Sequence, residues 1–381
     1  MSLIMKNISI WEKKWFTSYD YVVIGGGIVG CFTALEIAKE KKNSKIAIIE
    51  RGILPMGAST KNAGFACFGS ISEIENDRKK MPDLDLLSLI ELRVLGLKKL
   101  RNVLGDKNIS FSKFGGYELF FNKKKIEDRV DKINNFLEPL MGKSCFSLCN
   151  NKIEDYGFKK DIVAGLSVNK HEGALDPGKV IYTLKKKLGT LGVDFYFSTQ
   201  VESFEENTKG VFLKLKGKIQ TIGIKTNKLA VCTNAFAKKW FNQESISPGR
   251  GLILVTNRLP KLKINGCFHY NKGYYYFRNI DNRLLLGGGR EIDVKNETTY
   301  SFGTNKKIRQ RLIEDLKTFI LPNSDFNIEN EWSGIMGFGK SKLPLIKRVS
   351  ENISLGVRLG GMGISIGSIV GEKTAELVLG K

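Results

Sequence analysis

The stretch that decides the fold is YVVIGGGIVG at residues 21–30, in which an apolar, β-branched run enters a glycine-rich turn. Gly25 permits a tight turn, Gly27 lets the backbone approach a pyrophosphate, and Gly30 lets the following helix pack on the strand. The pattern therefore predicts a strand, a turn and a helix that bind the phosphates of a nucleotide. The residues expected to make this contact are Gly25, Gly27, Ile28, Val29 and Gly30.

The residues after this turn complete a strand–turn–helix–strand unit. Residues 31–39 carry apolar side chains at helical spacing, and KIAII at 45–49 reads as a buried parallel strand that ends at Glu50. Glu50 follows Gly30 by 20 positions, where a carboxylate can accept hydrogen bonds from both ribose hydroxyls of an adenine nucleotide. An acidic side chain there disfavours a 2′-phosphate, so we expect a dinucleotide without that group.

The composition is that of a globular chain. Its 381 residues, 42% of them apolar, suffice for two or three domains. No apolar run reaches the length of about 18 residues that a membrane span needs, and residues 1–20 lack a continuous apolar segment, so we expect neither a span nor secretion. Six cysteines without CxxC pairs and two isolated histidines predict no metal site and a reduced, cytoplasmic setting.

The formal net charge of +22 is unusual for an enzyme of this size. Such a charge can indicate a polyanionic partner such as nucleic acid. The lysines are spread along the chain, however, and do not form one basic stripe interleaved with aromatic residues. We therefore expect a lysine-rich surface and no nucleic-acid partner, and keep RNA as the alternative partner.

A segment rich in small residues, RGILPMGASTKNAGF at 51–65, follows Glu50. It contains many turn formers and becomes too apolar toward its end for a solvent loop. Small residues let backbone N–H groups approach phosphates and a ring system, and Ser59, Thr60 and Lys61 offer hydroxyl and ammonium donors. A segment of this kind can run alongside a flat cofactor, or be a plain loop with a helical turn.

Together these motifs resemble the FAD-dependent D-amino-acid oxidase superfamily, which includes glycine and sarcosine oxidases. The resemblance covers nearly the whole chain, and its GAS-x-x-NAG form at 57–64 is most similar to the bacterial amine and γ-glutamylputrescine oxidase branch. It implies FAD as the cofactor, bound non-covalently because the cysteine that attaches flavin in sarcosine oxidases is absent. The FAD contacts that the resemblance implies in this part of the chain are Glu50, Arg51, Ser59, Thr60, Lys61, Asn62, Ala63 and Gly64.

Two later segments also match the cofactor half of this superfamily. The first comprises a strand that begins near Val201 and a buried strand at 228–235 that ends at Thr233 and Asn234. The second is a glycine-rich turn before the last helix, whose free N–H groups stabilise negative charge on the flavin. The matching residues of this turn are Gly361, Met362, Gly363 and Ile364.

The predicted fold class is α/β, with a Rossmann-like FAD-binding domain of the GR2 type and an α+β substrate domain on a mostly antiparallel sheet. Short alternating runs from residue 248 onward predict that sheet. Helices are expected near 82–104, 124–140, 179–191 and 305–321, and residues 141–161 read as irregular. The FAD-binding domain is assigned to 1–83, 155–240 and 338–381, and the substrate domain to 84–154 and 241–337.

The substrate site is predicted on one strand of that sheet and on a later segment, 331–338. Alternation places Tyr274, Tyr276 and Arg278 on one face of the first strand, and the resemblance puts Tyr276 near a tyrosine that closes over substrate. In the later segment the resemblance places Met336 where amino-acid oxidases carry an arginine that holds the substrate carboxylate. An amine therefore becomes more plausible as substrate than a simple amino acid. Groups that could replace this arginine are Arg250, Arg278, Lys340 and Lys342.

The resemblance predicts an FAD-dependent amine or amino-acid oxidoreductase. A C–H bond next to a neutral amine gives a hydride to flavin N5, the resulting imine hydrolyses, and the electrons pass to O2 or another acceptor. The protein mainly orients the substrate and excludes water. The alternatives are an RNA-directed flavoprotein that acts on modified wobble uridine of tRNA, a 2-hydroxy-acid dehydrogenase on the same fold, and a plain FAD-binding electron carrier.

Overall fold

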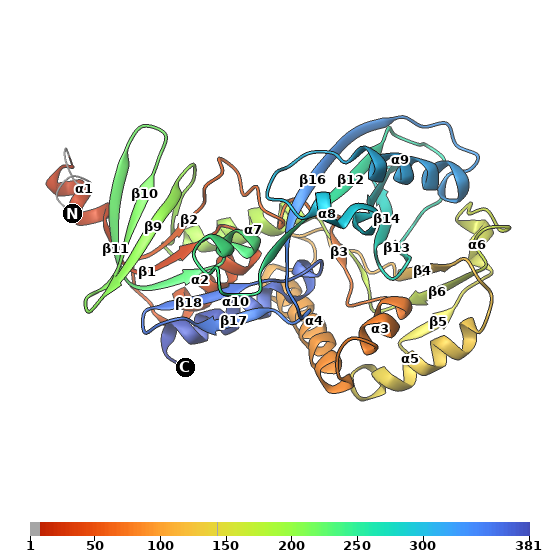
Figure 1. The fold of residues 1–381 in the computed structure, drawn as a ribbon, viewed down its shortest axis with the longest axis horizontal. Coiled ribbons are helices and arrows are strands. Elements are labelled where there is room, and N and C mark those ends of the chain that lie inside the picture. The colour runs from red at the N-terminus through yellow and green to blue at the C-terminus, as the bar shows by residue number, and fades with distance from the viewer. Residues whose placement is uncertain (1–7, 143) are drawn as a thin grey trace.

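The computed structural model describes residues 8–142 and 144–381 and contains two large sheets, one in each half of the molecule (Figure 1). Residues 1–7, which belong to the predicted first domain, lie outside this range. Across the described residues, no helix combines the length and the apolar character that a membrane crossing requires.

The first sheet is organised around the predicted nucleotide-binding unit. Its strand order is β17-β18-β11-β1-β2-β8, and β10 joins it by pairing with both β11 and β9. The strands β8, β2, β1, β11 and β18 run parallel. Their bounds are β1 (Ser18–Ile24), β2 (Ile46–Ile49), β8 (Asp194–Tyr196), β9 (Gln200–Asn207), β10 (Gly210–Lys216), β11 (Thr221–Val231), β17 (Leu345–Arg348) and β18 (Ile353–Val357).

Both faces of this sheet are covered, which explains why its central strands read as continuous apolar runs. Successive side chains of β1 point to opposite faces. Val23 packs into a core formed with helices, whereas Val22 and Ile24 pack into a second core formed with β9, β10 and β11. The helices of the first core are α2 (Ile28–Glu40), α4 (Asp83–Leu104), α7 (Pro177–Thr190) and α10 (Gly363–Leu379).

The second sheet has the order β16-β12-β15-β14-β13-β4-β6-β5. All its pairs are antiparallel except β13 with β4, so the prediction of a mostly antiparallel sheet is confirmed. Its bounds are β4 (Gly116–Phe120), β5 (Phe146–Leu148), β6 (Gly165–Asn169), β12 (Ser247–Thr256), β13 (Cys267–Tyr270), β14 (Tyr275–Ile280), β15 (Arg283–Gly288) and β16 (Ile328–Phe338).

Shorter elements complete the structure. The remaining helices are α1 (Ile10–Phe16), α3 (Ile71–Arg78), α5 (Ile126–Met141), α6 (Lys152–Asp155), α8 (Val294–Glu297) and α9 (Lys306–Asp315). The 3-10 helices η1 (Asn234–Lys239) and η2 (Arg290–Asp293), the π-helical turn η3 (Leu316–Ile320) that extends α9, and the pair β3 (Phe65–Ala66) and β7 (Gly173–Ala174) make up the rest.

Two expectations differ from the structure. Residues 141–161 are not irregular throughout, because they contain β5 and α6, two short elements that sequence periodicity does not detect. They form because β5 hydrogen-bonds to β6 and α6 buries Ile153. In addition, β6 lies within the range 155–240 assigned to the FAD-binding domain, but its hydrogen bonds go to β4 and β5 of the second sheet. The division of the chain into domains stays a prediction.

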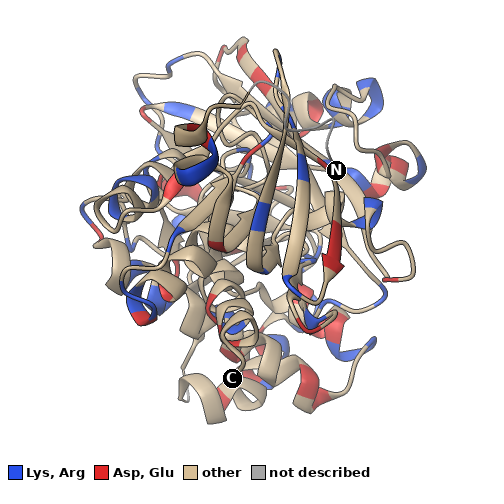
Figure 2. Ribbon diagram, turned by 90° about the vertical axis from the view of Figure 1, so that its left-hand side faces the viewer, with Lys and Arg blue, Asp and Glu red and all other residues tan. Residues whose placement is uncertain are grey.

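Charged side chains are spread over the molecule. Figure 2 shows lysines and arginines on many separate elements, with acidic residues among them. Several exposed lysines pair with acids, for example Lys160 with Glu154 at 2.9 Å and Lys214 with Glu202 at 2.8 Å. This distribution is what a lysine-rich surface predicts, and the question of a nucleic-acid partner stays open to experiment.

Candidate active site

A continuous cavity of about 930 Å³ connects the first sheet to the second. Its volume lies at the upper end of the range for ligand sites. At one end it is lined by the glycine turn after β1 and by Glu50, and at the other by Tyr276 and Met336. The two halves of the predicted site therefore belong to one cavity.

The glycine turn is as tightly packed as its sequence requires. Gly25 has a φ of +109°, and a Cβ there would lie 2.7 Å from the carbonyl oxygen of Cys232. A Cβ at Gly27 would lie 2.9 Å from Ser59 Oγ, and one at Gly30 would lie 1.9 Å from the carbonyl oxygen of Gly25. Helix α2 begins at Ile28 without a side-chain cap, so its N-terminus is suited to bind an anion.

The contacts of Glu50 hold the turn and the next loop together. Its two carboxylate oxygens accept hydrogen bonds from the N–H of Gly26 at 3.1 Å and of Gly52 at 2.9 Å. The carboxylate also lines the cavity, where its remaining lone pairs are placed to accept from a ribose. Arg51 lines the cavity as well, with its guanidinium carbon 3.8 Å from the ring centroid of Phe236.

The small-residue segment runs beside the glycine turn, as predicted. Ser59 Oγ accepts from the N–H of Ile28 at 2.9 Å, which leaves its own proton free. Asn62 holds the loop in shape, because its amide donates to the carbonyls of Ala58 and Ser59 at 3.0 Å each and accepts from the N–H of Gly64 at 2.8 Å. The cavity-lining residues of the segment include Ser59, Lys61, Asn62 and Ala63.

Three predicted contacts do not line the cavity. Thr60 Oγ1 donates to the carbonyl of Pro55 and stabilises the loop. Gly64 has a φ of +73°, and a Cβ there would lie 2.2 Å from the carbonyl oxygen of Leu175. Gly30 packs against Gly25, the structural role that the motif gives its third glycine. These three residues stabilise the loop and the turn without lining the cavity themselves.

The later cofactor segments meet the first ones at the cavity. Val201, Thr233 and Asn234 line its wall, and the buried hydroxyl of Thr233 has no hydrogen-bond partner among the described residues. The terminal turn contributes its four predicted residues, Gly361 to Ile364. Its helix α10 packs directly on α2, because a Cβ at Gly367 would lie 2.6 Å from Ile28 and one at Gly371 would lie 2.5 Å from Phe32.

At the other end, Tyr276 and Met336 face the cavity. Tyr276 lies across Gly287, where a Cβ would be 2.6 Å from its ring, and makes an edge contact with Phe65 at 5.6 Å between ring centroids. Burial raises the pKa of Tyr276 to about 12, so its hydroxyl stays protonated and can donate. Tyr274 also lines the cavity and is 40% exposed, which places it at the rim.

Arg278 does not line the cavity, in contrast to the prediction of a catalytic role. Its side chain is buried, and Nη1 donates to the carbonyls of Leu175 at 3.1 Å and Gly64 at 3.4 Å. As alternation predicted, Arg278 shares a face of the strand with Tyr276. At the position of Arg278, however, this face packs on the small-residue segment and not on the cavity. Arg278 therefore connects the second sheet to the cofactor loop.

The other candidates for an anion-binding group differ in how they are paired. Arg250 is held by Glu297, with contacts of 2.7 and 2.9 Å. Lys342 contacts Asp77 at 2.7 Å and Glu73 at 3.1 Å. Lys340 lines the cavity and is exposed. Arg250 and Lys342 therefore already have carboxylate partners.

Arg290, which the sequence reasoning missed, is a further cation on the cavity wall. It begins η2, separated by one residue from the end of β15, and its guanidinium lies 4.6 Å from the ring centroid of Phe338. No ion pair of Arg290 occurs among the described residues, and its only side-chain hydrogen bond there is a long one, 3.5 Å to Thr298 Oγ1. Its buried Nε has no partner. A sequence signal existed, because Arg290 follows the triple glycine that ends a predicted strand.

A buried charge network forms another part of the wall. Burial opposes the charge of Glu73, but Lys342 and Arg93 outweigh this effect and lower the pKa of Glu73 to about 2. Arg93 lies 3.4 Å from Glu73 and donates to the carbonyl of Phe68 at 2.8 Å. Arg93 belongs to α4, a helix in which the sequence predicted no site residue.

The glycine turn, Glu50 and the turn before α10 together define a dinucleotide site of the kind that FAD-dependent oxidoreductases use. The residues present fit FAD, because a cradle without side chains, two uncapped helix N-termini and an unpartnered hydroxyl face one cavity. The chain belongs to the DAO family, described as FAD dependent oxidoreductase, whose family model matches residues 20–377. The predicted family and cofactor are thereby confirmed.

Individual relatives cover nearly the whole chain. The glycine oxidase of Bacillus subtilis (strain 168) is 23% identical over 371 residues, which cover 95% of this chain and 94% of that protein. The glycine oxidase structure from Geobacillus kaustophilus has a TM-score of 0.76 at 18% identity and covers 96% of this chain and 95% of its own. The L-α-glycerophosphate oxidase of Mycoplasma pneumoniae, solved with FAD bound, has a TM-score of 0.75 at 16% identity over 96% and 95% of the two chains.

Proposed function

We propose that this protein oxidises the C–N bond of a small amine that carries an anionic group, and that it binds FAD without a covalent link. The observation that supports this substrate class is Arg290, a half-buried cation on the wall of the cofactor cavity for which no carboxylate partner is found among the described residues. A desolvated guanidinium facing a cavity favours an anion. In this proposal Arg290 takes the place of the arginine that amino-acid oxidases carry at the position of Met336.

Each group at this end of the cavity has a task in the proposed reaction. Arg290 binds the anionic group and so fixes the orientation of the substrate. The hydroxyl of Tyr276 stays protonated and donates a hydrogen bond. Met336 and Phe65 supply apolar wall that excludes water. An amine that binds unprotonated needs no base to start the reaction, because the nitrogen lone pair is already free.

The bound flavin supplies the acceptor for the hydride that leaves the carbon next to nitrogen. The substrate also loses a proton from nitrogen and becomes an imine, which water hydrolyses after release. The glycine oxidase relatives support the choice of a C–N bond, since their names describe oxidation of an amino acid.

Anaerobic reduction of the flavin by matched substrates tests this proposal. Each pair consists of an amine and the same amine with a carboxylate. We expect bleaching with the carboxylate member and much slower bleaching with its partner. In Arg290→Gln the rate for the carboxylate member should fall about 100-fold or more, the cost of removing one partner of a desolvated charge pair, while the rate for the neutral amine changes little.

Arg283→Gln is the matched control, because Arg283 begins the strand that Arg290 follows and makes an exposed ion pair with Glu329 at 2.6 Å. The control should behave as the wild type.

If no amine or amino acid in the panel bleaches the flavin, the proposed function is wrong. If Arg290→Gln slows both members equally, the anion-binding role is wrong. Admission of air after reduction separates an oxidase from a dehydrogenase, and 2-hydroxy acids in the panel test that alternative.

The net charge of +22 is the observation that favours the RNA-directed alternative. Binding of tRNA that weakens steeply with salt would support it, and no binding at low salt would remove it. A cytoplasmic location is inferred from the cysteines, since all six are free and buried, as expected in a reducing compartment.

A further inference from the structure

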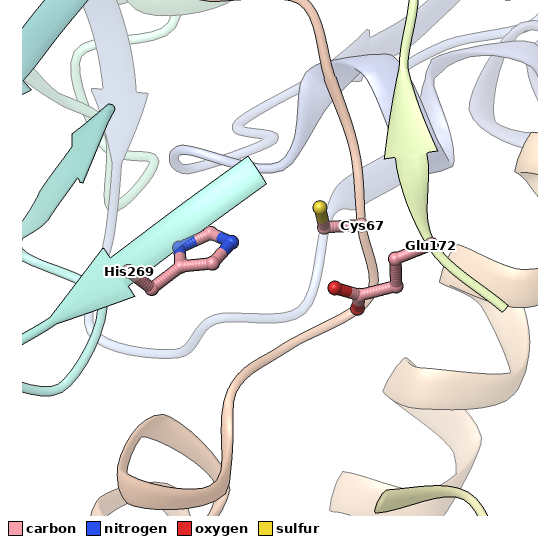
Figure 3. Close-up of side chains that lie close together, drawn as sticks. All are labelled: Cys67, Glu172 and His269. Carbon is pink, nitrogen blue, oxygen red and sulfur yellow. The ribbon is translucent and has the colours of Figure 1, made fainter. Parts of the chain in front are cut away.

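Three side chains that could ligate a metal meet in the wall of the cavity (Figure 3). Cys67 directly follows β3, Glu172 precedes β7, and His269 lies on β13 next to Tyr276 of β14. Their potential ligand atoms all lie within 4.8 Å of one another. Isolated cysteines and histidines predicted no metal site, because spacing along the chain does not reveal residues that three separate segments bring together.

We propose that Cys67, Glu172 and His269 bind one divalent metal ion of the zinc type, with one coordination position open to the cavity. Thiolate, imidazole and carboxylate are the ligands that Zn²⁺ takes in proteins, and three protein ligands with an open fourth position are typical of its reactive sites. A tetrahedral ion with bonds of about 2.0–2.3 Å would separate its ligand atoms by about 3.5 Å. The three side chains therefore need to close in by only about 1 Å.

The position of His269 supports this ligand set. Its Nε2 is shielded from solvent and has no hydrogen-bond partner among the described residues. In Figure 3 the outer end of the ring points toward Cys67 and Glu172. An unpaired buried nitrogen is costly unless something binds it.

The two acidic ligands are held in place by groups around them. The N–H of Phe68 donates to Glu172 Oε1 at 2.8 Å, and a glycine at 116 leaves room for the carboxylate, since a Cβ there would lie 1.8 Å from Oε2. Ser365 Oγ donates to the backbone carbonyl of Cys67. Such outer contacts orient the first ligands of a metal site. The Cys67 thiol lies 3.9 Å from the carbonyl oxygen of Gly173 and interacts with the Cys267 thiol and the Glu172 carboxyl group.

Charge favours a single divalent ion at this place. Cys67 is 1% and Glu172 2% exposed, so a thiolate and a carboxylate here would be two buried negative charges. A divalent ion that displaces one proton from each would leave the buried site without net charge. Glu73, the neighbouring carboxylate, is already paired with Arg93 and Lys342.

The direction of the open position follows from which ligands face the cavity. Cys67 and His269 line it, whereas Glu172 approaches from behind. An ion held between them would therefore present its fourth position to a molecule in the cavity, and would bind water or an amine, hydroxyl or carboxylate group there.

Zinc binding to the flavin-loaded protein tests the site directly. The protein is treated with a chelator, freed of it, and titrated with Zn²⁺ against a chromophoric competitor. We expect one equivalent per chain and an affinity that rises with pH, since the acidic ligands must lose protons. X-ray absorption at the zinc edge should show a single sulfur at about 2.3 Å and lighter ligands at about 2.0–2.1 Å. No stoichiometric binding, or two sulfurs, which would bring in Cys267, would overturn the proposed set.

Variants identify the ligands. Cys67→Ser and His269→Gln should each weaken zinc binding by about 100-fold or more, beyond what outer contacts contribute. His171→Gln, at the exposed second histidine beside Glu172, and Cys149→Ser, at a buried cysteine directly after β5, should bind as the wild type. Flavin content and melting temperature show whether each variant is folded. Equal affinity in all four variants, or a loss only in the controls, contradicts the proposal.

Discussion

The third glycine of the phosphate-binding turn tests how tightly the cofactor site is built. In Gly30→Ala, the new Cβ would lie 1.9 Å from the carbonyl oxygen and 3.1 Å from the carbonyl carbon of Gly25. Both are backbone atoms, so no side-chain rotation relieves the contact. The turn and α2 must separate by about 1.1 Å to restore even a short contact of 3.0 Å.

The expected magnitude follows from two opposing terms. Alanine is favoured over glycine inside a helix by about 1 kcal/mol, whereas forcing a methyl group into a packed site costs about 1–3 kcal/mol. The variant should therefore be less stable by no more than about 2 kcal/mol. A shift of about 1 Å breaks charge-assisted hydrogen bonds to a phosphate, each worth about 1.5 kcal/mol or more. Loss of two of them weakens FAD binding by about 100-fold.

Flavin affinity is measured by fluorescence quenching as FAD is added to deflavinated protein. The matched control is Gly189→Ala, because Gly189 also lies inside a helix, α7, but has no heavy atom within 4 Å of its added Cβ. This control should bind FAD as the wild type and gain a little stability. If Gly30→Ala binds FAD as well as Gly189→Ala does, the turn does not contact the phosphates in the way proposed.

Three further predictions concern the support of the site. Burial raises the pKa of Glu118 from 4.5 to about 7, so its contribution to stability is present below pH 4.5 and is lost as the pH rises to 7. In the wild type the free energy of unfolding should therefore fall by about 3 kcal/mol over that range. In Glu118→Gln this fall should be absent, as measured by urea unfolding. Lys342→Met leaves Glu73 and Asp77 without their exposed cation and should cost about 1–2 kcal/mol at pH 7, which Lys342→Arg should largely restore in thermal unfolding. Asn62→Ala leaves the Gly64 N–H without its acceptor and should cost about 1–3 kcal/mol and lower flavin occupancy, whereas Asn122→Ala, in an exposed turn, should leave purified flavin content unchanged.

The sequence predicted best those elements whose structure depends on nearby residues. The glycine turn, the buried strands on either side of α2 and the helix α4 lie where periodicity placed them. The strands β13 and β15 lie in the region where short alternating runs predicted the second sheet, because alternating side chains and turn residues specify both ends of a strand. Short elements such as β5 and α6 form through pairing and burial against distant strands, which a local pattern does not contain.

Parts of the site that the sequence missed lie on elements that also pack the core. Arg93 falls in the buried stripe of α4 with Ile90 and Leu97, at spacings of three and four residues. A charged residue in such a stripe was a signal, since arginine is almost never fully buried without partners. The helical periodicity of the apolar residues predicted only which face of α4 packs against the core. The ion pair of Arg93 with Glu73 depends on how α3 meets α4, which no spacing within either helix predicts.

The surroundings of Met336 illustrate why the substrate specificity was harder to predict than the cofactor. Met336 pairs with Gly249 across the sheet, and a Cβ at Gly249 would lie 2.9 Å from Arg290 Nε. The guanidinium of Arg290 thus lies over the strand position opposite Met336, although it belongs to a segment 46 residues earlier in the chain. A comparison of the sequence at position 336 alone indicates that the cation is absent. The pairing of β12 with β16, however, places the cation of Arg290 beside that position. The proposed anion site therefore depends on the pairing of β12 with β16. A Cβ at Gly249 would also lie 2.3 Å from the Phe338 ring, so Gly249→Ala should displace both side chains and slow flavin reduction by the carboxylate substrate more than by its neutral partner.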